Sequence, residues 1–104
     1  MDIIIQSLGF KAGENLETYI REKLAKLTPD EHIVRANVTL FLGPDRATQN
    51  TYCEIRLEVP GNDLFVKENS PEFEQAVDEA VNKLQGILRK AKEKLVDRRQ
   101  GTAG

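Results

Sequence analysis

Lysine and arginine side chains are concentrated at the C-terminal end of this 104-residue chain. Residues 83–104 hold 7 Lys and Arg against 2 Asp and Glu, a net charge of +5. Residues 1–82 hold 8 against 15, a net charge of −7, so the total of −2 conceals a basic end. Ammonium and guanidinium groups neutralise phosphates, and the local field rather than the net charge attracts a polyanion. This end of the chain therefore predicts binding to a polyanion, without a chemical reaction.

The basic residues are spaced as on one long helix over residues 70–99. Apolar residues recur from Phe73 to Leu95 as a single stripe, and Ser70 followed by Pro71 suits a helix start. At about 100° per residue, one basic row beside this stripe consists of Lys83, Lys90 and Lys94. The helix dipole alone favours basic residues at this end, so a solvated helix is the simpler interpretation. The concentration of charge favours a binding surface of Lys83, Arg89, Lys90, Lys92, Lys94, Arg98 and Arg99.

Patterns upstream predict the elements that must position this helix. Residues 14–27 have the apolar spacing of a first helix, which carries Lys23 and Lys26 as further candidate binding residues. Strands are predicted for residues 2–8, 33–42, 51–59 and 64–68. The order β-α-β-β-β-α predicts an α+β fold, a four-stranded sheet with both helices packed on one face. We expect residues 1–99 to form a single domain and residues 100–104 to form a disordered tail.

Alternation within the strands predicts which side chains face the core. In the second strand these are Val34, Ala36, Val38, Leu40 and Leu42, and in the third strand they are Cys53, Ile55, Leu57 and Val59. The run Ile3-Ile4-Ile5 predicts apolar surroundings on both sides, as in an interior strand.

The opposite face of the sheet is a weaker candidate for nucleic-acid binding. Phe41 and Tyr52 fall on it, and aromatic side chains on a sheet can stack single-stranded bases. Glu54 and Glu58 share this face and would repel phosphate. The helices are therefore the preferred surface.

No residues have the spacing of an enzyme or metal site. His32 is the single histidine and stands among acidic residues, whereas a metal site needs several ligands at set spacing. Cys53 falls on the inward face of a strand, so a buried core residue is favoured over a nucleophile. There is no glycine-rich phosphate loop and no paired carboxylate signature. The sequence therefore predicts neither an enzyme nor a metal, a cofactor or a small-molecule substrate.

The composition predicts a cytoplasmic protein. No apolar run approaches the length of a membrane span, and the start MDIIIQSLGF lacks a basic leader and a cleavage site. A single cysteine cannot form an internal disulfide framework, which is typical of a reducing compartment. We expect no membrane association.

Two stretches, LETYIREKLAKL and EFEQAVDEAVNKLQGILRKAKEKL, resemble the family of ribosome hibernation promoting factor and ribosome-associated inhibitor A, in its short form. The resemblance covers nearly the whole chain and implies the same β-α-β-β-β-α fold. It also implies binding to the small ribosomal subunit, in the channel that mRNA and tRNA would use. Occupancy of that channel inhibits translation during dormancy or stress. We expect a monomer away from the ribosome.

The resemblance also implies which residues contact ribosomal RNA. Lys23 and Lys26 match the K-x-x-K-L ending of the family's first helix, and Lys83 matches the lysine of its D-x-x-x-x-K-L stretch. The alternating lysines that follow match Lys90, Lys92 and Lys94. The chain departs from the family at Gly86, where members often carry an arginine, and Arg89 is one turn away.

Two alternative functions stay open on the sequence alone. A double-stranded RNA-binding module also combines a sheet with two helices. A protein-interaction module would use the basic helix to bind an acidic regulatory partner. If the basic row binds ribosomes, reversing Lys83, Lys90 and Lys94 to glutamate should abolish binding and leave the fold intact.

Overall fold

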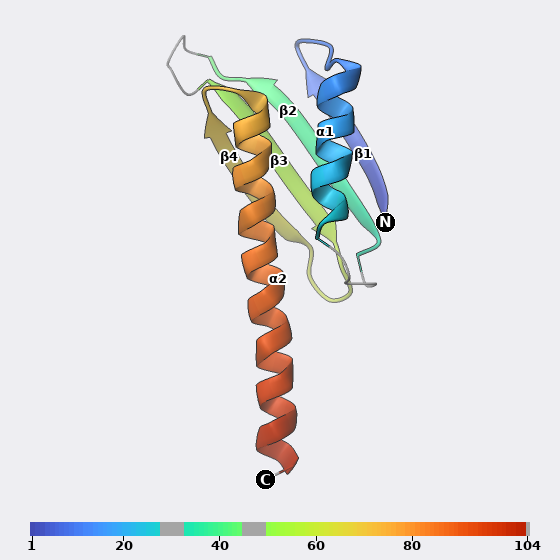
Figure 1. Cartoon of the computed structure of the whole chain (residues 1–104), viewed down its shortest axis with the longest axis vertical. Helices are drawn as coiled ribbons and strands as arrows, with labels where there is room; N and C mark the ends of the chain where they lie inside the picture. The colour runs from blue at the N-terminus through green and yellow to red at the C-terminus, as the bar shows by residue number, and fades with distance from the viewer. Residues whose placement is uncertain (28–32, 45–49, 104) are drawn as a thin grey trace.

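The elements follow the predicted order along the chain (Figure 1). The computed structural model describes residues 1–27, 33–44 and 50–103, and for residues 91–103 it describes the helical backbone alone. The elements are β1 (Asp2–Leu8), α1 (Glu14–Ala25), β2 (Arg35–Leu42), β3 (Thr51–Glu58), β4 (Leu64–Ser70) and α2 (Phe73–Ala103). The predicted β-α-β-β-β-α arrangement is confirmed.

The four strands form one mixed sheet in the order β1-β2-β3-β4. β2, β3 and β4 pair antiparallel through short connections, whereas β1 pairs parallel to β2. A parallel pair needs a crossover connection, and α1 supplies it. The register aligns Ile5, Val38, Ile55 and Val66 across the sheet, so one apolar row spans all four strands.

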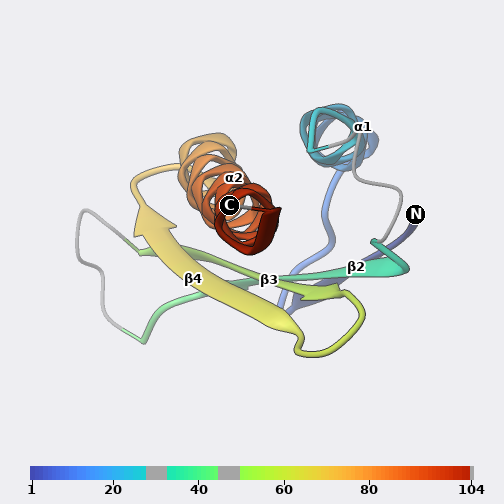
Figure 2. The ribbon, with the colours of Figure 1, turned by 90° about the horizontal axis from the view of Figure 1, so that it is seen from below.

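Both helices cover the same face of the sheet, as predicted (Figure 2). α2 packs over β3 and β4 and beside α1. The core between the layers is fully buried and includes Ile20, Leu24, Val38, Leu40, Ile55, Leu57, Val77 and Leu84. The alternation of apolar residues in β2 and β3 therefore assigned the faces of these two strands correctly at their centres.

The predictions for β1 and for the ends of β2 were wrong. β1 lies at an edge of the sheet, and Ile4 is 49% exposed on the face that the helices leave open. Val34 and Leu42 are 58% and 50% exposed, although their alternation places them with the core residues. Leu42 is the last residue of β2, and Val34 immediately precedes the strand, where Ile33 and not Val34 joins the core.

The start of α2 also differs from the prediction. Ser70 belongs to β4, and the first helical residue is Phe73. The Ser70 carbonyl accepts a hydrogen bond from Thr51 Oγ1 (2.6 Å), and its hydroxyl donates to Glu79 Oε2 (3.0 Å). Instead, the Glu72 carbonyl accepts the first hydrogen bond of the helix, from the Ala76 N–H. Ser70 thus ties the sheet to α2 and does not cap the helix.

The two helices end at different points from those expected. α1 ends at Ala25, and the N–H groups of Lys26 and Leu27 turn back to the carbonyls of Lys23 and Leu24. The helical backbone of α2 continues past Arg99 to Ala103. The disorder expected of residues 100–104 in solution stays a prediction, and Gly104 lies outside the described residues.

Candidate nucleic-acid interface

The basic part of α2 begins where the helix leaves the core. Among the described side chains of α2, Ile87 and Leu88 are the last that pack against the buried cluster. Beyond them the helix projects past the end of the sheet (Figure 1). Arg89 and Lys90 lie at this exit point with exposed side chains, and neither makes an ion pair within the described part of the chain. Both cationic groups are therefore exposed, and no described carboxylate neutralises them.

The remaining candidates of α2 lie on the projecting backbone. The helix of 31 residues corresponds to a length of about 46 Å at 1.5 Å per residue. Nothing is described of the side chains of Lys92, Lys94, Arg98 and Arg99, so their place in the binding surface stays a prediction.

Lys83, the first member of the predicted row, lies against the sheet. Its ammonium forms an ion pair with Oε1 of Glu68 in β4. The Lys83 side chain is 61% exposed, whereas the Glu68 side chain is only 17% exposed and its Oε1 is buried. A buried carboxylate needs a cation, because an uncompensated charge inside a protein is strongly destabilising. Lys83 therefore has a structural role in the docking of α2, whatever it binds outside.

Lys83→Glu should destabilise the fold, which corrects the expectation that reversal at this position leaves the fold intact. Two carboxylates would then meet beside the buried Oε1 of Glu68. We expect a loss of about 1–3 kcal/mol in the free energy of unfolding, measured by urea denaturation. The matched control is Lys90→Glu, which reverses an exposed charge on the same helix that has no ion-pair partner among the described side chains. This variant should change the free energy of unfolding by less than about 0.5 kcal/mol. Equal stability of the two variants would contradict a structural role for Lys83.

Lys23 is also engaged inside the protein. Its Nζ lies 3.3 Å from Asp78 Oδ1 on α2, so an ion pair links the two helices. The Tyr19 hydroxyl donates to the same Oδ1 atom (2.6 Å), and the Lys23 ammonium lies 5.5 Å from the centroid of the Tyr19 ring. The hydrogen bond to Asp78, followed by burial and the charges of Asp78 and Glu74, raises the pKa of Tyr19 to about 12. Lys23, Tyr19 and Asp78 thus form one polar cluster between the helices.

Lys26 differs from Lys23 because its side chain is exposed and forms no ion pair with a described residue. It follows the end of α1, and its backbone carbonyl accepts a hydrogen bond from Gln85 Nε2 of α2 (3.3 Å). Its side chain is exposed and makes no ion pair with the described residues. The contact with Gln85 holds the Lys26 backbone beside α2, one turn before Arg89.

Sequence reasoning missed the two acidic partners, Asp78 and Glu68. Asp78 carries no local signal for its contact with Lys23, because the two residues lie on different helices. Glu68 did carry a usable signal, because the alternation Leu64, Val66, Glu68 places it on the core side of β4. An acidic residue on a core-facing position requires a cation nearby.

Gly86 lies in α2 between Lys83, which forms an ion pair with Glu68, and Arg89, which forms none with a described side chain. A Cβ at this position would meet no atom within 4 Å, so the chain does not need glycine here for space. Gly86→Ala should therefore raise the free energy of unfolding by about 0.5–1 kcal/mol, since glycine weakens a helix interior. Urea denaturation measures this change. A destabilised variant would contradict the open surroundings of Gly86.

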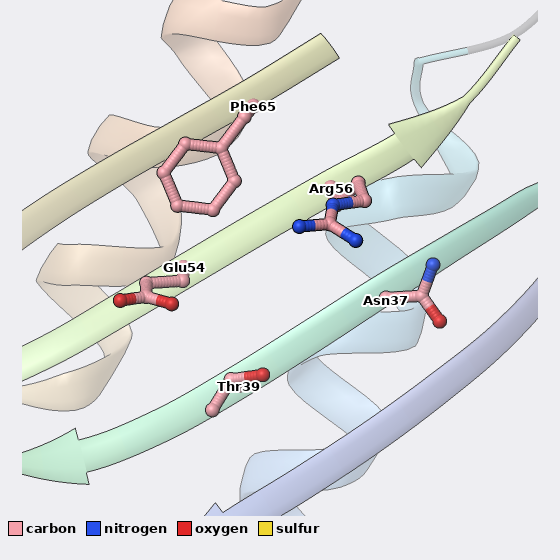
Figure 3. A pocket seen from close by; sticks show the side chains of 5 residues that line it. All are labelled: Asn37, Thr39, Glu54, Arg56 and Phe65. Atoms are coloured by element: carbon pink, nitrogen blue, oxygen red, sulfur yellow. The ribbon is translucent and has the colours of Figure 1, made fainter. Parts of the chain in front are cut away.

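The open face of the sheet is not a basic surface. Three cations and three acids share it by register, namely Arg35, Arg56, Lys67, Asp2, Glu54 and Glu58. A hollow of about 250 Å³ lies among the side chains of Asn37, Thr39, Glu54, Arg56 and Phe65 (Figure 3). This balance of charge supports the preference for the helices.

Two aromatic side chains on this face, Phe41 and Tyr52, pack against each other, whereas Phe65 is 52% exposed. The Phe41 and Tyr52 rings stack with centroids 5.0 Å apart and planes 4° apart. The Lys67 ammonium lies 5.6 Å and 5.3 Å from the two centroids, and 3.9 Å from Glu54 Oε1. Gly43 allows this arrangement, because a Cβ there would come within 2.7 Å of the Tyr52 ring. Phe41 and Tyr52 are both half-buried.

Among the described residues, the other groups considered for chemistry form no nucleophilic or metal site. Burial, followed by the charges of Glu54 and Glu68, raises the pKa of the Cys53 thiol to about 12, so the thiolate is strongly disfavoured. Within the described ranges no three metal-binding side chains gather, and His32 lies outside them. None of the described helices has the length and apolar character needed to cross a membrane.

The fold and the exposed cations define a small α+β domain with a basic helical end. Residues 3–96 match the family described as sigma 54 modulation protein / S30EA ribosomal protein, and the chain belongs to this family. Proteins of this family associate with ribosomes and are not enzymes. The resemblance noted in the sequence is therefore confirmed at the level of the family.

Two solved structures are similar to this chain over most of its length. A ribosomal subunit interface protein from Coxiella burnetii has a TM-score of 0.80 and 19% identity, covering 89% of this chain and 99% of that chain. The N-terminal domain of Protein Y from Thermus thermophilus has a TM-score of 0.75 and 25% identity, covering 86% of this chain and 98% of that one. No curated protein sequence matches the chain.

Proposed function

We propose that this protein binds the small ribosomal subunit in the channel used by mRNA and tRNA. Its occupancy of the channel would inhibit translation during dormancy or stress. The observation that carries the proposal is the pair of exposed cations, Arg89 and Lys90, at the start of a projecting basic helix, neither of which forms an ion pair with a described side chain. Family membership supports a ribosomal partner, and the similar protein from Coxiella burnetii is described as a subunit interface protein.

The proposed contacts are with the phosphates of ribosomal RNA. Lys26, just after α1, and the pair Arg89 and Lys90 of α2 form the described part of the surface. The further residues proposed on the same helix are Lys92, Lys94, Arg98 and Arg99. Such contacts fix position without reading base sequence, so the shape of the domain supplies the selectivity. Binding of this kind weakens steeply as the salt concentration rises.

The proposal places the protein in the cytoplasm as a monomer that joins the ribosome without a cofactor. Its partners are the small subunit and its RNA, with no membrane and no small-molecule substrate. The domain proposed to bind is residues 1–99, in which α1 and α2 lie on the same side of the sheet (Figure 2).

A competition experiment tests this proposal. Purified small subunits, either empty or preloaded with mRNA and P-site tRNA, are pelleted with the protein, and large subunits serve as the control. The proposal predicts strong binding to empty small subunits and greatly reduced binding to preloaded ones. Equal binding to both would contradict the channel site. Equally tight binding to naked duplex RNA would favour an RNA-binding module, and a protein partner retained after nuclease treatment would favour an interaction module.

A further inference from the structure

We propose that Asp78 restrains RNA binding by holding the Lys23 ammonium in an ion pair between the two helices. Lys23 then contributes its charge to an RNA phosphate only when this pair opens. This inference concerns the regulation of the proposed binding surface and therefore depends on the proposed function.

Geometry shows that the charge of Lys23 is locally cancelled. Asp78 Oδ1 lies 3.3 Å from the Lys23 ammonium. Asp78 is itself fixed, because the Tyr19 hydroxyl donates to the same oxygen at 2.6 Å. At a distance of several ångströms the two opposite charges produce a weak field, so an approaching phosphate is attracted little by Lys23.

Exposure shows that this pair can open, in contrast to the pair at Lys83. The side chains of Lys23 and Asp78 are 31% and 38% exposed, so water solvates both charges after separation. Glu68, the partner of Lys83, is 17% exposed and has a buried oxygen, so its separation would leave a charge without solvent. The two lysines therefore have different roles. The ion pair of Lys83 with Glu68 stays closed, whereas the ion pair of Lys23 with Asp78 opens and releases the Lys23 ammonium.

Lys23 is also well placed to reach the basic surface when it is released. It lies three residues before Lys26, whose carbonyl accepts a hydrogen bond from Gln85 of α2. Its ammonium lies between the two helices, 3.3 Å from Asp78 Oδ1 and 5.5 Å from the centroid of the Tyr19 ring. Rotation of the Lys23 side chain away from Asp78 would carry its charge toward the exposed side chain of Lys26.

Asp78→Asn tests this inference by removing the charge and keeping an oxygen that accepts the Tyr19 hydrogen bond. We expect binding to small ribosomal subunits to tighten by about 2- to 5-fold at low salt, the range set by an exposed ion pair. The gain should shrink as salt rises, since a charge effect is screened. Glu72→Gln is the matched control, because it removes one exposed carboxylate just before the same helix without breaking an ion pair of the described residues.

The second arm repeats Asp78→Asn in a Lys23→Gln background. The inference predicts that the gain disappears there, because Asp78 acts through Lys23. A gain that persists without Lys23, a gain no larger than that of Glu72→Gln, or no gain at all would overturn it. Elution from a heparin column under increasing salt repeats the comparison on a general polyanion. If the variants differ on heparin but the protein does not bind small subunits, then the proposed function fails and the restraint by Asp78 stands.

Discussion

Replacing Arg89 and Lys90 together by glutamate should weaken binding to the small ribosomal subunit by about 100-fold or more. Hydrogen bonds to charged groups contribute about 1.5–3 kcal/mol each, and two such contacts with phosphate would be lost. The new carboxylates would also repel the phosphates. Each lost phosphate contact should lower the slope of log affinity against log salt by about one. Pelleting with small subunits over a salt series measures both quantities.

The double variant is a clean test because neither residue holds the fold together. Both side chains are exposed and lie beyond Leu88, the last described residue of α2 that packs on the core. The matched control is Lys11→Glu with Arg56→Glu, which makes the same change of charge on exposed residues away from α2. Lys11 lies in the loop between β1 and α1, at the opposite end from the projecting helix (Figure 1). An equal loss of affinity in both double variants would show that total charge, and not this surface, governs binding.

Leu84→Ala should lower the free energy of unfolding by about 2–5 kcal/mol, the cost of a cavity in a packed core. Leu84 has no exposed surface and lies in the part of α2 that packs over the sheet. For a domain of this size, 1 kcal/mol shifts the melting temperature by about 4–8 °C, so the loss should be evident in thermal and urea unfolding.

This variant tests whether the projecting basic segment is anchored through the buried part of the same helix. The control is Asn82→Ala, an exposed position two residues earlier in α2, where we expect a change of less than about 0.5 kcal/mol. A cost below about 1 kcal/mol for Leu84→Ala would contradict the packing of α2 on the sheet. It would also remove the physical basis for a fixed position of Arg89 and Lys90.

Much of the fold could be predicted because its signals are local. Ala36, Val38 and Leu40 alternate along β2, and Cys53, Ile55 and Leu57 alternate along β3, so their burial follows from the period of a strand. The run Ile3-Ile4-Ile5 misled because composition does not reveal where a strand lies in a sheet. β1 became an edge strand through its parallel pairing with β2 alone.

The candidate site was predicted as a set of charges but not as a set of contacts. A helical wheel groups Lys83 with Lys90, yet Lys83 lies over β4 and pairs with Glu68, whereas Lys90 lies past the core. Likewise, nothing in the sequence spacing brings Lys23 of α1 to Asp78 of α2. These pairs depend on how the elements pack, which is set by long-range contacts and not by local periodicity.

The division into paired and unpaired cations follows from the structure. Lys23 and Lys83 have acidic partners, and Lys26, Arg89 and Lys90 have none among the described side chains. Substitutions at the first two therefore mix effects on the fold with effects on binding. Substitutions at the other three report on binding.

Co-sedimentation of the wild-type protein with purified ribosomes through a sucrose cushion, at low and high salt, tests the proposed function most directly. We predict that the protein pellets with the small subunit at low salt and is lost from the pellet as salt rises, because phosphate contacts carry the affinity. A folded protein that stays in the supernatant at low salt would contradict binding to the ribosome. Pelleting that is insensitive to salt would contradict the basic surface of α1 and α2 as its cause.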